Sequence, residues 1–189
     1  MSVALHTAMT QTEFFAWAEA QNERYEFDGF EPVLMPGGSG NHARIAGNIA
    51  FELRRHLGED SPCEALASDA GIQTVEDAVR YPDIVVACNA FDGRGRLVPD
   101  PVIVFEVVSP SSIREDRILK PREYAAVASI KRYVIVEQSV IGLTVLSRSG
   151  AEPWHFQTLK AGDTLRLPEI GIELPVDSLY ARVTFTPEA

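Results

Sequence analysis

The chain has 189 residues, of which 46% are hydrophobic, and its formal net charge at pH 7 is −10. This length and composition fit a single domain, residues 1–189, with one core. The apolar runs fall short of the roughly eighteen residues that a membrane span needs. An acidic chain repels phosphate backbones, so a role on nucleic acid requires a local basic surface.

The N-terminus and the cysteines indicate the cellular compartment. The opening stretch MSVALHTAMTQTEFF has neither a basic region nor a long apolar core, so no secretory signal is expected. Cys63 and Cys88 are far apart and belong to no CxxC or Cys/His spacing, so neither a disulfide framework nor a zinc site is expected. These features predict a cytoplasmic protein without membrane contact.

A helix and a hairpin are predicted near the N-terminus. Thr10-Gln-Thr-Glu13 has the form of a capping box, which predicts a helix over about residues 11–21. Asp28-Gly29, between an aromatic run and Phe30, predicts a two-residue β-hairpin.

A second helix follows the loop MPGGSG. Asn41 is expected to cap it, and Gly58 is expected to end it. Its apolar stripe consists of Ile45, Ile49, Leu53 and Leu57.

The rest of the chain predicts short strands with one further helix. A helix over REYAAVAS should begin near 117–121, because Pro121 has no N–H and fits only the first turn. The strand–helix–strand order from 102 to 137 is long enough for a right-handed parallel crossover. The pattern therefore predicts an α/β (α+β) domain with a mixed central sheet. The expected strands cover 63–67, 70–75, 84–86, 102–108, 132–137 and 142–147, followed by short β segments and a helical turn near 175–181.

Glu106 is the residue whose position needs explaining. It interrupts the run PVIVFEVV, whose β-branched and aromatic residues predict a buried strand. A buried carboxylate loses its hydration, at a cost of several kcal/mol unless a cation, a metal or dense hydrogen bonding compensates. The alternative is an edge strand on which Glu106 faces water.

Asp83 and Lys120 are the candidate partners of Glu106. Asp83 begins another apolar strand, and two carboxylates that share a site repel unless one is protonated or a divalent cation binds between them. Magnesium suits such a site because it needs only one or two protein carboxylates. The alternatives are a turn residue for Asp83 and, for Lys120, a surface pair with Asp116 or Tyr124.

Several motifs together resemble the Uma-two family of restriction-endonuclease-like proteins, within the PD-(D/E)XK nuclease superfamily. The resemblance spans about residues 11–180, and its most specific piece is the Glu-Val-x-Ser-Pro-Ser stretch that begins at Glu106. The segments that carry it are RYEFDGFEPVLMPGGSGNHARI, YPDIVV, PVIVFEVVSPSS, EDRILKPREYA and IKRYVIVE. It implies a restriction-endonuclease-like core, a mixed sheet flanked by helices.

The resemblance also implies a catalytic centre. Asp83, Glu106 and the backbone carbonyl of Val107 would bind Mg²⁺ or Mn²⁺. The superfamily places a lysine two residues after the second acid, but Val108 stands there in this sequence. The family's lysine on the next helix corresponds to Lys120, which would complete the catalytic set.

Two supporting residues follow from the same resemblance. Glu26 would join the acids and His42 would line the mouth of the site. The alternatives are a hairpin residue that points outward for Glu26 and a solvated residue in the first helical turn for His42.

The implied reaction is metal-assisted hydrolysis of DNA phosphodiesters by an endonuclease, with a homodimer as one way to cut both strands. Arg114, Arg117 and Arg122 would bind the DNA backbone, although this basic run also fits a solvated helix face. Two other functions compete with this one. The first is a catalytically degenerate nuclease fold that binds nucleic acid or a protein, and the second is a small-molecule metallohydrolase.

Overall fold

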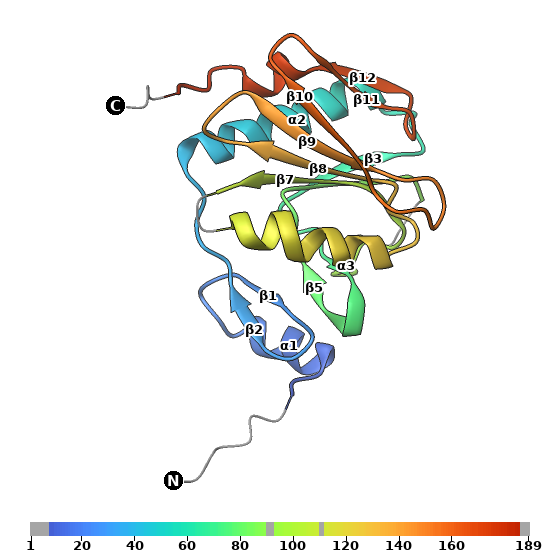
Figure 1. The fold of residues 1–189 in the computed structure, drawn as a ribbon. Coiled ribbons are helices and arrows are strands. Elements are labelled where there is room, and N and C mark those ends of the chain that lie inside the picture. The colour runs from blue at the N-terminus through green and yellow to red at the C-terminus, as the bar shows by residue number, and fades with distance from the viewer. Residues whose placement is uncertain (1–7, 90–92, 110–111, 186–189) are drawn as a thin grey trace.

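A six-stranded sheet forms the centre of the computed structural model, which describes residues 8–89, 93–109 and 112–185. The strand order is β10-β9-β8-β7-β6-β3, and only the β7–β8 pair is parallel (Figure 1). The predicted mixed sheet and the parallel pairing across the 102–137 unit are therefore confirmed. The strands are β3 (Glu64–Ala67), β6 (Ile84–Ala87), β7 (Pro101–Val108), β8 (Arg132–Glu137), β9 (Gly142–Ser147) and β10 (His155–Lys160).

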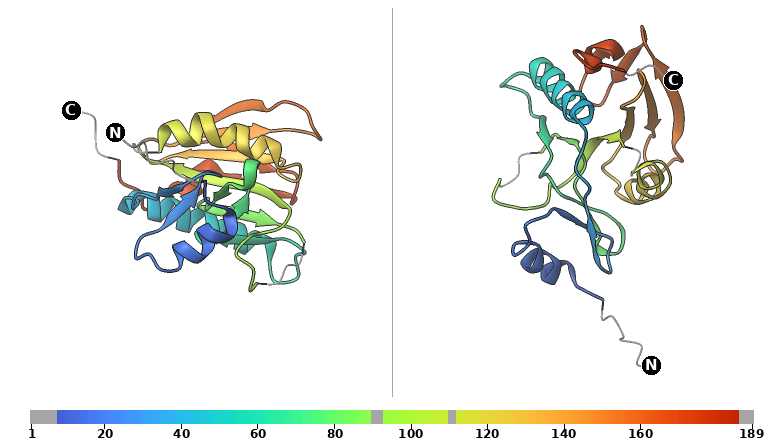
Figure 2. Two further views of the ribbon diagram at one scale, coloured as in Figure 1. Left: turned by 90° about the horizontal axis from the view of Figure 1, so that it is seen from below. Right: turned by 90° about the vertical axis from the view of Figure 1, so that its left-hand side faces the viewer.

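Helices cover both faces of this sheet (Figure 2). On one face lies α2 (Gly40–Leu57), which buries the predicted residues Ile45, Ile49 and Leu53. The other face is covered by a π-helical segment, η2 (Glu115–Leu119), that continues into α3 (Lys120–Ala126).

The strand alternation decides which side chains face which helix. Ile103, Phe105 and Val107 of β7 belong to the core beneath α2, whereas Val104 and Val108 belong to the core beneath α3. Because side chains alternate along a strand, Glu106 points toward α3.

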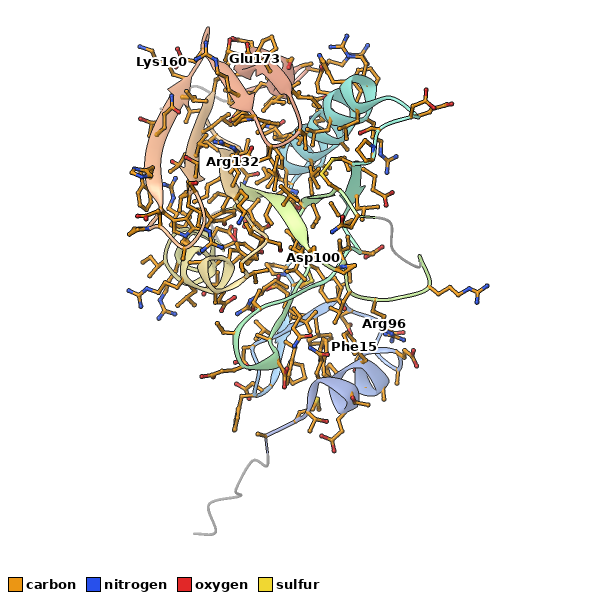
Figure 3. The ribbon with its side chains drawn as sticks, turned by 90° about the vertical axis from the view of Figure 1, so that its right-hand side faces the viewer. Phe15, Arg96, Asp100, Arg132, Lys160 and Glu173 are labelled. Carbon is orange, nitrogen blue, oxygen red and sulfur yellow. A yellow bond between two sulfur atoms is a disulfide. The ribbon has the colours of Figure 1, made fainter. Side chains whose placement is uncertain are left out.

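A smaller N-terminal part packs below the main sheet (Figures 1 and 2). Its four-stranded sheet has the order β2-β1-β5-β4, and Arg96, from the turn before β7, lies over the Phe15 ring of α1 at 5.3 Å (Figure 3). Its elements are α1 (Gln11–Ala18), β1 (Tyr25–Phe27), β2 (Pro32–Leu34), β4 (Ile72–Gln73), η1 (Val75–Asp77) and β5 (Val79–Arg80).

The C-terminal segment completes the core on the α2 side. It consists of the hairpin β11 (Thr164–Leu167) and β12 (Ile172–Pro175), followed by η3 (Val176–Tyr180). Leu165, Leu174 and Leu179 from this segment pack with the residues that α2 buries.

Three local predictions were wrong. The β1–β2 loop has four residues, Asp28–Glu31, because the Asp28 carboxylate accepts hydrogen bonds from the N–H groups of Phe30 and Glu31. The cap of α2 is Ser39, whose hydroxyl accepts a bond from the His42 N–H. A disulfide joins Cys63 to Cys88, because the antiparallel β3–β6 register brings them opposite one another.

Other local predictions were confirmed. The Thr10 and Glu13 side chains form both bonds of the capping box, and Pro121 lies in the first turn of α3. Of the polar loop after β7, Pro110 and Ser111 lie outside the described residues. No helix in the described ranges has the length and apolar character to cross a membrane.

Candidate active site

The register of β6 and β7 brings the two predicted acids together. Ile84 pairs with Phe105, so the next antiparallel position places Asp83 opposite Glu106 on the α3 side of the sheet. One Asp83 oxygen, Oδ2, accepts a 2.7 Å bond from the N–H of Val107. This bond ties the residue just before β6 to the end of β7.

Glu106 is buried in the interior of the sheet, with 5% of its surface exposed. The edge-strand alternative is therefore wrong, because β7 lies between β6 and β8. Its Oε1 atom accepts a 2.6 Å bond from Lys120 Nζ and a 3.0 Å bond from the Tyr124 hydroxyl. Lys120 and Tyr124 lie one turn apart on α3, so they reach the same carboxylate.

Lys120 is buried as well, with 6% of its surface exposed, so it does not form a surface ion pair. Oδ1 of Asp116, its predicted neighbour, lies 3.2 Å from Lys120 Nζ. This oxygen accepts no hydrogen bond of good geometry from the described residues. Asp116 is 2% exposed and is held through its backbone carbonyl by the Tyr133 hydroxyl, at 2.8 Å. The π-helical segment just before α3 therefore adds a third acid to the site.

Glu26 connects the site to the N-terminal sheet. Its Oε1 atom lies 3.4 Å from Lys120 Nζ and accepts a 3.1 Å bond from the N–H of Tyr81. Its Oε2 atom accepts a 3.1 Å bond from Arg80, which also donates two 2.7 Å bonds to Glu123 of α3. Glu26 is buried, so the outward-pointing alternative is wrong.

His42 meets Asp83 at the N-terminus of α2. Its Nε2 atom lies 3.3 Å from Asp83 Oδ2, and both side chains are 20% exposed. The hydrogen bond to Asp83 raises the pKa of His42, with a further contribution from the backbone of Val107, although burial opposes the shift. His42 therefore contacts the acid pair through Asp83, and both side chains are partly exposed.

The cluster holds more acids than permanent cations. Burial raises the pKa of Glu106 well above its ordinary value, and nearby carboxylates add to the shift, while Lys120 opposes it. Burial would lower the pKa of Lys120, but Glu106, Glu26 and Asp116 outweigh burial and raise it, so Lys120 is an ammonium. The carboxylates are Asp83, Glu106, Asp116, Glu26 and Glu123, and the permanent cations are Lys120 and Arg80.

The pH dependence of stability should report the Glu26 interaction. Burial opposes ionisation, but Lys120 and Arg80 outweigh it and lower the pKa of Glu26 below 4.5. A lowered pKa stabilises the fold above the unfolded value, and this stabilisation is lost as the pH falls through the folded value. The free energy of unfolding of Glu26→Gln should therefore lie below that of the unmodified protein at neutral pH, with a gap that narrows below pH 4.5.

Denaturant titrations at several pH values would measure this gap. The control is Glu173→Gln, which alters an exposed ion pair with Arg166. A gap of constant size across the acid range would contradict the assignment.

The donors at the acid pair fit a hard divalent cation. Lys120 and Tyr124 both bind Oε1 of Glu106, so Oε2 accepts no hydrogen bond from the described residues. Oδ2 of Asp83 accepts the bond from the Val107 N–H and contacts His42. Oδ1 of Asp83 likewise accepts no hydrogen bond from the described residues. Within the described ranges, no group of three or more His, Cys, Asp or Glu side chains could hold a metal ion. The remaining donors are the two carboxylates, and Mg²⁺ with several waters needs only one or two of these.

The three predicted basic residues are all exposed. Arg117 also pairs with Glu137 at the end of β8. Farther along, Arg132 is buried and pairs with Glu169 (Figure 3 labels Arg132). The exposed part of the basic run therefore includes Arg114, Arg117 and Arg122, and Arg132 does not belong to it.

Sequence reasoning missed four members of the cluster as site residues. Arg80 and Glu123 form ion pairs between segments that are distant in the chain, so no local spacing reveals them. The i, i+4 spacing of Asp116 and Tyr124 about Lys120 was a usable signal, but it indicated surface pairs and not a buried site.

Comparisons with known proteins agree with this architecture. The family model Uma2, described as "Putative restriction endonuclease", matches residues 11–177. Two proteins of Synechocystis sp. are similar in sequence. The uncharacterized protein slr1290 is 30% identical over 179 residues and 94% of both chains, and sll1609 is 26% identical over 158 residues, 82% of this chain and 89% of that one.

One solved structure shares the fold. It is a crystal structure from Anabaena variabilis, described as a putative nuclease belonging to DUF820, with a TM-score of 0.72 and 12% sequence identity. The match covers 93% of this chain and 99% of that chain. The predicted restriction-endonuclease-like fold is thereby confirmed.

Proposed function

Because the chain belongs to the Uma2 family of putative restriction endonucleases, we propose that it is a metal-dependent endonuclease that hydrolyses DNA phosphodiester bonds. One observation carries the proposal. Five carboxylates and two permanent cations form a largely buried cluster, and Asp83 and Glu106 each keep one oxygen that accepts no hydrogen bond from the residues the structure describes. A divalent cation would favour the ionised form of these acids and so offset the excess of carboxyl groups over permanent cations.

Asp83, Glu106 and the Val107 carbonyl would hold Mg²⁺ or Mn²⁺. The cation would supply a bound water of lowered pKa and screen charge on the reacting phosphate. His42 keeps Asp83 Oδ2 in place through its 3.3 Å contact. Lys120 donates a hydrogen bond to Glu106 and would offer its ammonium to the oxygens of the phosphate, in the manner of a cationic clamp.

The surroundings of Lys120 explain how it can serve both groups. Asp116 and Glu26 lie 3.2 and 3.4 Å from its Nζ atom. If Glu106 turns toward a cation, these acids still compensate the buried ammonium. Lys120 on α3 would thus replace the lysine that the superfamily places at the position of Val108.

A second candidate function is a nuclease fold that binds DNA or a protein without cleaving. The observation that favours it is the closed Lys120–Glu106 pair, in which both side chains are almost fully buried. In that case the pair acts only as a structural link between α3 and β7.

Calorimetric titration with Mg²⁺ and Mn²⁺ tests the proposal. We expect binding to the unmodified protein and its loss in Glu106→Gln, with an unchanged isotherm for the control Glu173→Gln on the exposed hairpin. Circular dichroism verifies that each variant is folded.

Absence of binding to the unmodified protein would favour the non-cleaving module. Binding that survives Glu106→Gln would refute the assigned ligands. Assays on mixed-sequence DNA then follow, because an unknown target makes an early negative result uninformative.

A further inference from the structure

A cleft of about 510 Å³ lies beside η2 and α3. Arg117, Pro121 and Ala125 line it, whereas Lys120 and Tyr124, which bind Glu106, are not among its lining residues. The segment from Arg148 to Phe156 forms the facing wall. The volume lies within the range of small-ligand sites, about 300–1,000 Å³.

Two residues make this wall rigid. The Trp154 indole donates a 2.8 Å bond to the carbonyl of Pro121. Arg148 stacks on the Trp154 ring, 4.7 Å from its centroid, and its guanidinium donates to backbone carbonyls at and beyond the end of α3, including that of Ile130 at 2.9 Å. The wall is therefore ordered without a ligand, which lowers the entropic cost of binding.

Three other residues of the cleft remain available to a ligand. Phe156 lies on the edge strand β10 with 70% of its surface exposed. Ile118, which also lines the cleft, is half exposed. Arg122 is exposed and forms no ion pair with the residues that the structure describes. An exposed aromatic ring in the same cleft as an arginine that forms no ion pair with the described residues suits a base and its phosphate.

The charge of the cleft is opposite to that of the chain as a whole. Arg117, Arg122 and Arg148 line it together with one acid, Glu152, although the net charge of the protein is −10. Local positive charge in an acidic protein favours binding of a polyanion at this place.

One residue of the cleft also reaches the end of the sheet near the candidate active site. Arg117 pairs with Glu137, and Glu137 pairs with Val108 in the parallel β7–β8 ladder. Val108 directly follows Glu106 and Val107. A strand that leaves the acid cluster can therefore pass Arg117 and enter the cleft.

We propose that this cleft binds an unpaired nucleotide of a nucleic-acid strand, with its base on Phe156 and its phosphate on Arg122 and Arg117. The inference rests on the proposed function, since it assigns a second contact to the substrate of the same site. It adds a preference for substrates with a single-stranded segment.

Fluorescence anisotropy in EDTA tests the inference, because it measures binding without cleavage or metal. The probe is a labelled, mixed-sequence single-stranded oligonucleotide. Phe156→Ala should weaken binding about tenfold, as expected for loss of one stacking contact. Arg122→Ala should reduce the slope of log affinity against log salt by about 0.7, as for one phosphate on a single strand.

Matched controls lie outside the cleft. Phe51→Ala removes a ring of similar exposure, 62%, from α2, and Arg166→Ala removes an exposed arginine from β11. Both should bind the oligonucleotide as the unmodified protein does.

The outcomes separate this inference from the proposed function. Weaker binding by Phe156→Ala supports the cleft even if no cleavage is ever detected. Equal binding by Phe156→Ala and Phe51→Ala overturns it, even if metal binding and cleavage are established. A dimer that Phe156→Ala dissociates, with unchanged oligonucleotide affinity, also overturns it and assigns the face to a second copy of the chain.

Discussion

Replacing Lys120 by methionine is expected to lower the free energy of unfolding by about 3–5 kcal/mol and to abolish DNA cleavage. The stability loss follows because Glu106, Asp116 and Glu26 would remain buried without the ammonium that contacts all three. Methionine fills a similar volume, so the change removes charge and leaves the packing nearly intact. Denaturant titration at neutral pH measures the first effect.

The loss of cleavage follows from the role of Lys120 beside the reacting phosphate. Removal of one such cationic donor lowers turnover by about 100-fold or more. Lys160→Met is the control, because Lys160 is exposed on β10, away from the cluster. Full activity of Lys120→Met on a substrate that the unmodified protein cleaves would end the assignment of Lys120 as the catalytic lysine.

Replacing Arg80 by methionine is expected to destabilise the protein by a similar amount, about 3–5 kcal/mol. Burial would lower the pKa of Arg80, but its bonds to Glu123 and the charge of Glu26 raise it, so the guanidinium is charged. Its removal leaves two largely buried carboxylates without their partner. Glu26 belongs to β1 and Glu123 to α3, so the N-terminal sheet should also detach more readily from the main body.

Hydrogen exchange would locate this effect. Amide protons of β1 and β5 should exchange faster in Arg80→Met, whereas those of β8 and β9 should not. Arg166→Met serves as the control, because its ion pair with Glu173 is exposed and contributes little. A variant with unchanged stability would mean that the buried triad does not hold the two parts together.

The local elements were largely predictable because their causes are local. The capping box at Thr10, the apolar stripe of α2 and the β8–β9 hairpin each depend on residues within a few positions of one another. The predicted β1–β2 turn was too short, because the Asp28 carboxylate accepts bonds from backbone N–H groups within a longer loop. The predicted α2 cap was wrong, because the Ser39 hydroxyl accepts the bond from the first turn of the helix. When neighbouring polar side chains compete for the same backbone N–H groups, the sequence does not show which of them binds.

The disulfide and the ion-pair network were not predictable for a different reason. Cys63 and Cys88 meet through the pairing of β3 with β6, and the Arg80–Glu123 pair joins β5 to α3. Both depend on how distant segments pack, and neither leaves a periodic signal in the chain.

From the order of residues alone, Glu106 is a carboxylate inside an apolar strand, so it needs a compensating group. The identity of that group follows from the packing of the folded chain. The antiparallel register brings Asp83 opposite Glu106, and the packing of α3 brings Lys120 to 2.6 Å from it. The free-energy cost of burying the Glu106 carboxylate depends on the apolar residues around it in the strand, which can be read from the chain. The compensating interactions depend on distances between strands and helices, which the order of residues does not specify.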